Sequence, residues 1–380
     1  METDAASELR EVLAHYEIGE LVDYEQLHLG YCNVSYIIDT VAQGQIDRYF
    51  FRKYKRGIRE EELAFEHSVI QHLVGKGFDL VAGVMSTNDG KTYVKRLEDA
   101  GDAESGEEIF YAIFDFLPGE DRYTWVSPAC TDQDLRGSAC VLAGFHDAVC
   151  DLIPSGRRYE LKIIDLLPSM AEAVQRYGQR PGATEFDVYL VENLRLIQKT
   201  IDHTVRALGT GECAEVVQQV IHCDYHPGNL KFQGGEIVSM SRFATCRGLF
   251  DFDWSKVDAR CFDVALAIYY FCTAWEGSKD GALQLEEAAT FLGTYQDNLR
   301  GTGGVGPLDD VELRCLPHMI QASNLYVLNW TIEDFYNSIE PDPHEYLMYL
   351  QHGVRTITWL NDAAHRDELE RTIAESARPS

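Results

Sequence analysis

The spacing of apolar residues changes along the chain, and the change divides it near residue 118. Before that point, β-branched and aromatic residues stand in short runs, which are typical of strands in an antiparallel sheet. Strands are predicted over residues 24–40, 47–55 and 109–117, and a hairpin is predicted over 81–95 with its turn at Asn88-Asp89-Gly90. Apolar residues three and four positions apart predict helices over residues 5–16 and 59–75.

Beyond residue 118 the helical spacing dominates. Helices are predicted over residues 131–150, 184–207, 258–274, 284–299, 309–336 and 344–375, and the stretch "ECAEVVQQV" (212–220) is also predicted to be helical. A strand-turn-strand zone over residues 230–253 is the exception. The order predicts an α+β protein with two lobes: residues 1–117 form an antiparallel sheet with a packed helix, and residues 118–380 are mostly helical.

Composition and charge limit the partners of the protein. Its 380 residues are 45% hydrophobic, and no apolar run is long enough to span a bilayer. The N-terminus lacks the basic start and apolar core of a signal peptide, so we expect a cytoplasmic protein. The formal net charge of −29 repels nucleic acid and anionic membranes, which argues against both partners. It would favour a cationic small molecule, although acidic surfaces usually serve solubility alone.

The ten cysteines include no C-x-x-C pair. Zinc clusters and redox pairs therefore have no support, and we expect reduced thiols that pack as small hydrophobic side chains.

Candidate chemistry lies in the loop "IHCDYHPGNL" (221–230), where polar residues stand among apolar ones. Asp224 and Asn229 lie five apart, and the next strand ends in Asp251 and Asp253. Converging carboxylate and amide oxygens suit Mg²⁺ that holds a polyphosphate. A carboxylate left free of metal can accept a proton from an attacking hydroxyl, as phosphoryl transfer requires. The alternative is a polar turn whose Asp and Asn cap a helix.

The spacing H-x-D-x-x-x-x-N, followed by a strand that ends in D-F-D, resembles the catalytic segment of the protein-kinase-like fold. The variant H-x-D-x-H-P-x-N is similar to the superfamily of aminoglycoside phosphotransferases, choline kinases and type II homoserine kinases, over about residues 24–300. The resemblance implies that Asp224 is the catalytic base and that Asn229 and Asp251 bind Mg²⁺. It also implies that His222 braces the loop and that ATP is the phosphoryl donor.

Asp263 is the one charge in the apolar run 261–274. A buried carboxylate must find hydrogen-bond donors. The resemblance implies that Asp263 accepts them from the backbone of the catalytic loop, and the alternative is an Asp that faces solvent at a helix start.

Glu66 falls within the apolar stripe of the helix over 59–75. Its carboxylate therefore either pairs with a cation from the neighbouring strand or extends from the edge of the stripe to solvent. Kinase-like folds pair such a Glu with a strand base that grips the nucleotide phosphates. Strand alternation means that Arg52 and Lys53 cannot both point inward. We choose Arg52, since many relatives have "LR" or "LK" at this place, and keep Lys53 as the alternative.

Two further segments resemble nucleotide-binding parts of the family. The stretch "LGYCNVSY" (29–36) contains Gly30, Asn33 and Ser35, and such a loop can offer backbone N–H groups to phosphates, or it is an ordinary hairpin turn. The stretch "FDFLPG" (114–119) resembles the hinge at which Asp115, Phe116 and Leu117 would present backbone groups to adenine. The sequence "GTGGVG" (301–306) follows a helix, so we assign it to a connection between helices.

The expected activity is an ATP- and Mg²⁺-dependent transfer of the γ-phosphate to a hydroxyl of a small molecule, namely an amino alcohol, amino acid, aminoglycoside or sugar. Trp254, Trp275, Trp330 and Asp334 lie in regions where the superfamily forms its acceptor pocket, and aromatic faces with a carboxylate suit an alkylammonium. The alternative for each tryptophan taken singly is core or surface packing. One alternative is an ATP-binding pseudokinase, although Asp224, Asn229 and Asp251 are all present. The other is a protein kinase, although G-x-G-x-x-G in the strand-rich lobe and an A-P-E segment are both missing.

Overall fold

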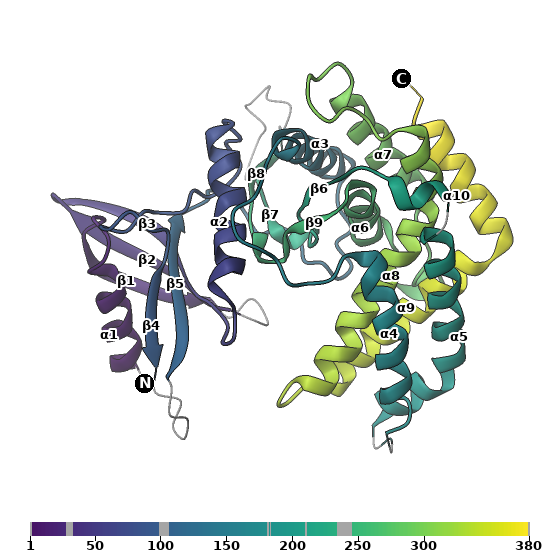
Figure 1. The fold of residues 1–380 in the computed structure, drawn as a ribbon, viewed down its shortest axis with the longest axis horizontal. Coiled ribbons are helices and arrows are strands. Elements are labelled where there is room, and N and C mark those ends of the chain that lie inside the picture. Colours follow the sequence, from purple (N-terminus) through teal and green to yellow (C-terminus); the bar gives the residue numbers. More distant parts are fainter. Residues whose placement is uncertain are drawn as a thin grey trace. The chain divides into compact units, whose positions relative to one another are not determined.

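The structure is a computed structural model that describes residues 2–27, 33–98, 106–180, 182, 184–209, 211–233 and 245–378 (Figure 1). The chain forms two compact units. Unit 1 consists of Met1–Pro118, Ile153–Arg158 and Gly248–Asp253, and unit 2 of Gly119–Leu152, Tyr159–Arg247 and Trp254–Ser380. Asp251 therefore belongs to unit 1, whereas Asp224 and Asn229 belong to unit 2.

Unit 1 is built on a five-stranded antiparallel sheet with the strand order β1-β2-β3-β5-β4. Its elements are α1 (Glu2–Leu13), β1 (Glu20–Leu27), β2 (Val34–Ala42), β3 (Gln45–Lys53), α2 (Glu60–Gly75), β4 (Val94–Glu98) and β5 (Glu107–Asp115). The single strand expected over 24–40 is thus parts of two, β1 and β2. Strands β2 and β3 join at Gln43-Gly44, where both residues have positive φ, as a tight right-twisted hairpin requires.

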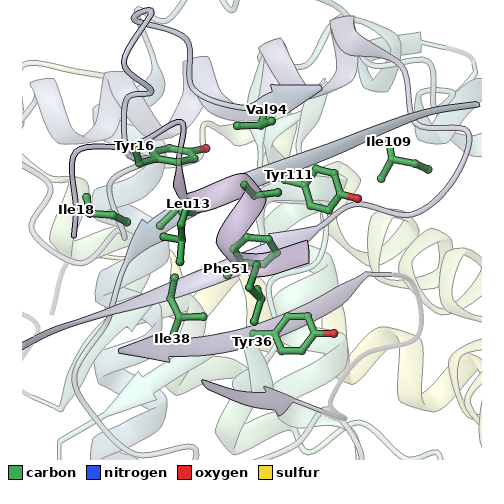
Figure 2. Packing of buried hydrophobic residues seen from close by; sticks show 12 residues of the cluster. Leu13, Tyr16, Ile18, Tyr36, Ile38, Phe51, Val94, Ile109 and Tyr111 are labelled. Atoms are coloured by element: carbon green, nitrogen blue, oxygen red, sulfur yellow. The ribbon is translucent and has the colours of Figure 1, made fainter. Parts of the chain in front are cut away.

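Side chains of β3 alternate between the two faces of this sheet. Phe51 points to the face that α1 covers, in a core with Tyr36, Tyr111 and Leu13 (Figure 2). Arg52, the next residue, points to the opposite face, where its guanidinium contacts Glu66 of α2. Phe51 therefore packs in the apolar core under α1, and Arg52 is directed toward α2.

The hairpin predicted over 81–95 is only partly correct. The turn at 88–90 forms, but β4 is the only strand beside it. Val81 and Val84 instead form isolated bridges with Leu249 and Phe114. This arm pairs with distant segments, so sequence proximity did not identify its partners.

Unit 2 is mostly helical and contains two small two-stranded sheets, β6-β9 and β7-β8. Its helices are α3 (Asp132–Val149), α4 (Ile163–Tyr177), α5 (Glu185–Leu208), α6 (Arg260–Cys272), α7 (Leu285–Leu299), α8 (Asp310–Asn337), α9 (Pro343–Asn361) and α10 (Ala363–Ser376). Its strands are β6 (Gln218–Ile221), β7 (Leu230–Phe232), β8 (Cys246–Leu249) and β9 (Lys256–Ala259), and β8 runs on into unit 1. Its short helices are η1 (Gly211–Glu215), η2 (Pro227–Asn229) and η4 (Gly277–Lys279), while η3 (Phe252–Trp254) lies mostly in unit 1. Helix α6 is buried along its whole length and packs on α7 and α8.

Two predictions for unit 2 need correction, and one helix was missed. Residues 212–220 are not a helix but η1 followed by β6, because the β-branched end of this stretch pairs with β9. The helix expected over 344–375 is interrupted at Asp362, whose side chain accepts from the first N–H groups of α10. Helix α4 was not predicted at all, and Pro168 lies inside its first turns.

The prediction for the cysteines was also wrong in one respect. Cys213 in η1 and Cys315 in α8 form a disulfide, with Cα atoms 5.7 Å apart. They are 102 residues apart in sequence, so no spacing motif pointed to the pair.

In the part of the chain that the structure describes, no helix is long and apolar enough to cross a membrane.

Candidate active site

The loop that follows β6 is held from behind by one buried carboxylate. The backbone N–H groups of His222 and Cys223 each donate to Asp263 on α6, at 2.9 Å to its two oxygens. Asp263 is fully buried. Its place in an otherwise apolar helix, noted in the sequence, follows from this contact, because the helix packs in the core and presents the carboxylate to the loop.

Asp263 has a third donor in His146 on α3. The Nε2 atom of His146 lies 3.0 Å from Asp263 Oδ2, and its Nδ1 atom lies 2.8 Å from the Tyr295 hydroxyl. Burial lowers the pKa of His146, and burial alone would raise the pKa of Asp263, but the hydrogen bond from His146 helps to lower it. A neutral imidazole that donates from Nε2 to an ionised Asp263 satisfies both groups, and Nδ1 then accepts from Tyr295.

Asp224 is positioned by the same loop. The Asn229 side-chain amide donates to the backbone carbonyl of Asp224 at 2.9 Å and to its Oδ2 atom at 3.0 Å. His226 Nε2 lies 3.5 Å from the same oxygen. Burial raises the pKa of Asp224, but the His226 and His222 imidazoles and the Asn229 amide outweigh it, and the net pKa is lowered. The carboxylate is thus held ionised and in a fixed orientation.

The backbone and core residues around Asp224 make the loop rigid. The His222 ring is completely buried between the rings of Phe145 and Tyr225. The Tyr225 hydroxyl donates to the Ser138 carbonyl at 2.6 Å. Cys223 has a φ of 62°, a conformation that non-glycine residues rarely adopt outside constrained sites.

Arg52 in unit 1 is surrounded by carboxylates. Its Nη2 atom lies 2.8 Å from Asp251 Oδ1, and its Nη1 atom lies 3.4 Å from Glu66 Oε1. Asp253 acts on the same guanidinium electrostatically. Burial and the charges of Asp253 and Asp251 raise the pKa of Glu66 to about 7, although Arg52 lowers it. Burial and the charge of Asp251 raise the pKa of Asp253 to about 6. Arg52 and Arg158 both lower the pKa values of these two carboxyls, but they do not offset burial and the repulsion among the carboxyls.

The structure also distinguishes Arg52 from its alternative. Lys53 lies on the face of the sheet that α1 covers, and its Nζ atom lies 2.6 Å from Glu8 and 3.1 Å from Glu98. Of the two candidates, only Arg52 contacts Glu66.

A chain of hydrogen bonds supports Glu66 on its other side. The Tyr54 hydroxyl donates to Glu66 Oε2 at 3.1 Å and lies 3.0 Å from His67 Nε2. His67 Nδ1 lies 2.7 Å from the Thr92 hydroxyl. Burial lowers the pKa of His67 to about 3, so its ring is neutral and can donate to Tyr54 while it accepts from Thr92. This chain could not be predicted from sequence patterns, because Tyr54 and His67 resemble ordinary core residues.

The structure gives contacts for some of the residues expected to bind the nucleotide, but not for all of them. Gly30 lies outside the described residues. The Asn33 side-chain amide donates to Asp253 at 2.9 Å and accepts from the Lys55 N–H, and Ser35 is buried on β2 opposite Arg52. In the hinge-like segment, the N–H of Asp115 donates to the Gly83 carbonyl. Asp115 thus uses its N–H within unit 1, and the adenine-binding role of Asp115, Phe116 and Leu117 stays a prediction.

Unit 2 contains a cluster of aromatic rings that begins at His226, in the loop after β6. His226 lies 5.3 Å from the ring of Tyr270, and Tyr270 lies 6.2 Å from Trp125. The further rings around Trp125 are Tyr349 at 4.5 Å, Trp275 at 5.7 Å and Trp330 at 6.1 Å. The structure thus brings two of the predicted tryptophans together, while Trp254 ends η3. Asp334 accepts from the hydroxyl of Tyr346, whose ring stacks on Trp330.

Trp125 was missed in the sequence because it stands alone in the irregular stretch "RYTWVSPAC". A large aromatic residue in a loop between two predicted elements was the available signal.

Each of the two residues expected to bind Mg²⁺ has an oxygen to offer within its own unit. Asn229 uses its amide nitrogen for Asp224, and its amide oxygen makes neither of those bonds. Asp251 gives one oxygen to Arg52, and its side chain is about a third exposed. No three His, Cys, Asp or Glu residues among those described form a metal cluster of their own. Few protein ligands are expected for Mg²⁺ in such sites, because the phosphates and water supply the others.

The segment 301–306, set aside in the sequence, has a structural explanation. Arg260 donates to the carbonyls of Val305, Gly306 and Pro307, and its guanidinium pairs with the buried Glu312. The segment is thus held against α6 and α8 as a connection.

Comparisons with known proteins give one consistent result. The model of a family described as "Phosphotransferase enzyme family" matches residues 23–300. A homoserine kinase of Bradyrhizobium sp. (strain ORS 278) is 26% identical over 354 residues, which are 91% of this chain and 93% of that protein.

Solved structures resemble the fold. An aminoglycoside phosphotransferase from Alicyclobacillus acidocaldarius has a TM-score of 0.59 at 13% identity, covering 95% of this chain and 96% of that one. A choline kinase from Cryptosporidium parvum has a TM-score of 0.57 at 13% identity, covering 98% and 99%. These similarities confirm the predicted α+β fold of the protein-kinase-like type.

Proposed function

The chain belongs to the phosphotransferase enzyme family and is a small-molecule kinase, and from this premise we propose that it transfers the γ-phosphoryl group of ATP to a hydroxyl of a small molecule that carries an amine. Mg²⁺ is the proposed companion of the nucleotide. Membership in this family is compatible with many acceptor molecules, so the acceptor has to be inferred from the residues of this chain.

The observation that supports turnover best is the arrangement around Asp224. Asp263 holds two successive backbone N–H groups just before it, and Asn229 holds both its backbone carbonyl and its carboxylate. This support fixes a carboxylate at the point where an acceptor hydroxyl would have to be oriented. A binding protein without turnover would have no need for so complete a constraint.

Each polar residue has a role in the proposed reaction. Asp224 accepts a hydrogen bond from the acceptor hydroxyl and takes its proton late, since the transition state of phosphoryl transfer is loose. Its lowered pKa suits orientation better than early deprotonation. Arg52, held by Glu66, binds phosphate oxygens of the nucleotide. When bound by Asn229 and Asp251, Mg²⁺ would neutralise charge on the β- and γ-phosphates.

The aromatic cluster around Trp125 supports an amine on the acceptor. Its rings connect to the catalytic loop through Tyr270 and His226, and carboxylates stand at both ends, Asp224 on the loop and Asp334 beside Tyr346. Aromatic faces and carboxylates together attract an ammonium group. Homoserine is the first acceptor to test, because the curated relative is a homoserine kinase that aligns over nearly its whole length.

The test is ADP release from Mg-ATP with a panel of acceptors: homoserine, choline, ethanolamine, an aminoglycoside and a sugar without an amine. We expect stimulation by an amine-bearing acceptor, and a loss of at least about a thousandfold in kcat for Asp224→Asn, which keeps the shape of the side chain. Stimulation by the neutral sugar alone would refute the proposed acceptor class. Binding of ATP without stimulation by any acceptor in a panel widened to other hydroxyl compounds would refute the kinase and favour an ATP-binding protein.

A further inference from the structure

A short strap, residues 153–158, lies along helix α2 of unit 1. The strap follows α3 in the sequence and belongs to unit 1, whereas the chain on either side of it belongs to unit 2. The backbone N–H of Ser155 donates to the Ser68 hydroxyl at 3.0 Å, and that of Arg157 donates to the Glu61 carbonyl at 2.9 Å. The two contacts are about two helical turns apart, so the strap is bound along the length of α2.

The strap fits most closely against α2 at Gly156. This residue has a φ of 75°, in the region that glycine adopts without strain. A Cβ atom at this position would collide with the Glu61 carbonyl oxygen and would lie 2.9 Å from the Ala64 Cβ atom. A residue with a side chain would therefore have to move away from the helix. The close fit fixes the main chain two residues before Arg158.

The chain beyond the strap is anchored within unit 2. The buried Lys256 of β9 donates from Nζ to the Leu161 carbonyl at 2.7 Å. The Tyr326 hydroxyl donates to Glu160 Oε1 at 2.8 Å. These anchors come two and three residues after Arg158, so the main chain that carries this arginine is held on both sides.

The Arg158 side chain faces carboxylates of unit 1. It is 7% exposed, and its Nη1 atom lies 4.0 Å from Glu62 Oε1 in the first turn of α2. Glu66 follows four residues later, on the same side of the helix. Arg158 lowers the pKa values of Glu66 and Asp253, as Arg52 also does. The strap thus brings a second guanidinium to the carboxylates around Arg52.

A second guanidinium changes how firmly the first is held. Arg52 donates to Glu66 at 3.4 Å and to Asp251 at 2.8 Å, so Glu66 is the weaker of its two contacts. An ionised carboxylate holds a guanidinium more strongly than a neutral carboxyl does. A cation beside Glu66 stabilises its charge against burial and against the neighbouring carboxylates, and so strengthens its hold on Arg52.

We propose that Arg158 is a positioning residue for nucleotide binding in unit 1. It acts on Arg52 through Glu66, and the strap holds it beside α2 for this role. The inference rests on the proposed function, because Arg52 is expected to bind phosphate oxygens of ATP. Loss of Arg158 should therefore weaken nucleotide binding and should leave the chemical step at Asp224, in unit 2, unchanged.

The test is the dissociation constant of Mg-ATP, measured by titration calorimetry on the full chain without an acceptor. We expect Arg158→Gln to raise it about fivefold, the size expected for the loss of one charge contact. Arg158→Lys keeps the charge and should restore most of the affinity. Arg157→Gln, at an exposed position in the same strap, is the matched control and should bind Mg-ATP as wild type does. With an acceptor that supports turnover, the KM for ATP should rise in Arg158→Gln at constant kcat.

A double-mutant cycle separates positioning from a general structural role. If Arg158 acts through Glu66, Arg158→Gln should change the affinity by less than about twofold in a Glu66→Gln background. Equal factors in the two backgrounds would overturn the inference alone, and so would an Arg158→Gln variant that binds Mg-ATP as tightly as wild type. A wild-type protein that does not bind Mg-ATP would instead refute the proposed function, and the inference with it.

Gly156→Ala tests the strap without changing a charge. The added methyl group would collide with the Glu61 carbonyl, so the strap should shift and the affinity for Mg-ATP should fall severalfold. Gly77→Ala is the matched control, because Gly77 has a φ of 70° but no described atom lies within 4 Å of the added Cβ. Equal Mg-ATP affinities of these two variants would overturn the inference even if Arg158→Gln failed to fold.

Discussion

The two units stabilise their charged groups in opposite ways. In unit 2, the buried Asp263 accepts two backbone N–H bonds and one bond from a neutral His146, so its charge is fully compensated. In unit 1, the guanidinium of Arg52 faces Glu66, Asp251 and Asp253, and burial together with repulsion among these carboxyls raises the pKa values of Glu66 and Asp253, although Arg52 and Arg158 lower them. The first arrangement is complete in the protein alone. The second carries surplus negative charge, which suits the proposed arrival of a cation with the nucleotide.

The largest effect should follow from Asp263→Ala. The change leaves the N–H groups of His222 and Cys223 and the Nε2–H of His146 without their acceptor in a fully buried place. We expect a loss of about 3–5 kcal/mol in unfolding free energy and at least about a hundredfold in kcat. Denaturant titration and steady-state kinetics measure both. Asp310→Ala, at an exposed position in α8, is the control, and an equal response of the two variants would refute the account of a complete network.

Reduction of the Cys213–Cys315 disulfide should weaken unit 2 specifically. The bond closes a loop of about a hundred residues, so its removal should cost about 2–4 kcal/mol through the entropy of the unfolded chain. Scanning calorimetry with and without reductant measures the shift, and Cys213→Ser should no longer respond to reductant. If unit 1 unfolds separately, its transition should stay in place. An unchanged midpoint in both conditions would contradict the prediction.

The pH dependence of stability should reveal the charge imbalance of unit 1. The folded pKa of Glu66 is raised to about 7, so the native state binds a proton more tightly than the unfolded state does. Stability from this group is therefore present at low pH and is lost as pH rises through about 4.5 to 7. Arg52, Arg158, Asp251 and Asp253 act on the same carboxyl.

Relative to Glu66→Gln, wild type should gain about 2 kcal/mol of unfolding free energy between pH 7.5 and pH 5. Thermal midpoints of the two proteins across this range measure the difference. Glu61→Gln, an exposed change on the same helix, should follow wild type. Parallel pH curves for wild type and Glu66→Gln would show that the Arg52 cluster is balanced after all.

Tyr54→Phe should produce the smallest effect, and it tests the support of Glu66 and Arg52 in unit 1 directly. It removes one hydroxyl from the chain that supports Glu66, which is worth about 1 kcal/mol. We expect the KM for ATP to rise about fivefold with little change in kcat, because Arg52 would be held less firmly. Tyr93→Phe, which removes a hydroxyl that donates to the more exposed Glu60, is the control. A fall in kcat at constant KM would contradict a role in positioning Arg52.

Short-range patterns predicted the sheet and most helices, because strand alternation and helical spacing are local properties. The assignment of Arg52 rather than Lys53 to Glu66 needed the register of β3, which fixes the face of each residue. The strand β6 was misread as helix because its partner β9 lies almost forty residues later in the chain. The ring of Trp125 and the pairing of Cys213 with Cys315 likewise depend on contacts far apart in sequence, which the patterns do not contain.

The contact between Asp263 and the loop at 222–223 also fixes an order of events during synthesis. The loop leaves the ribosome some forty residues before the carboxylate that organises it, and α6 in turn packs on α8, which is made later still. The nascent chain therefore carries this loop without its support until α6 and α8 have been translated. Activity should therefore appear only late in synthesis, and a chain truncated after the loop should have no residual activity.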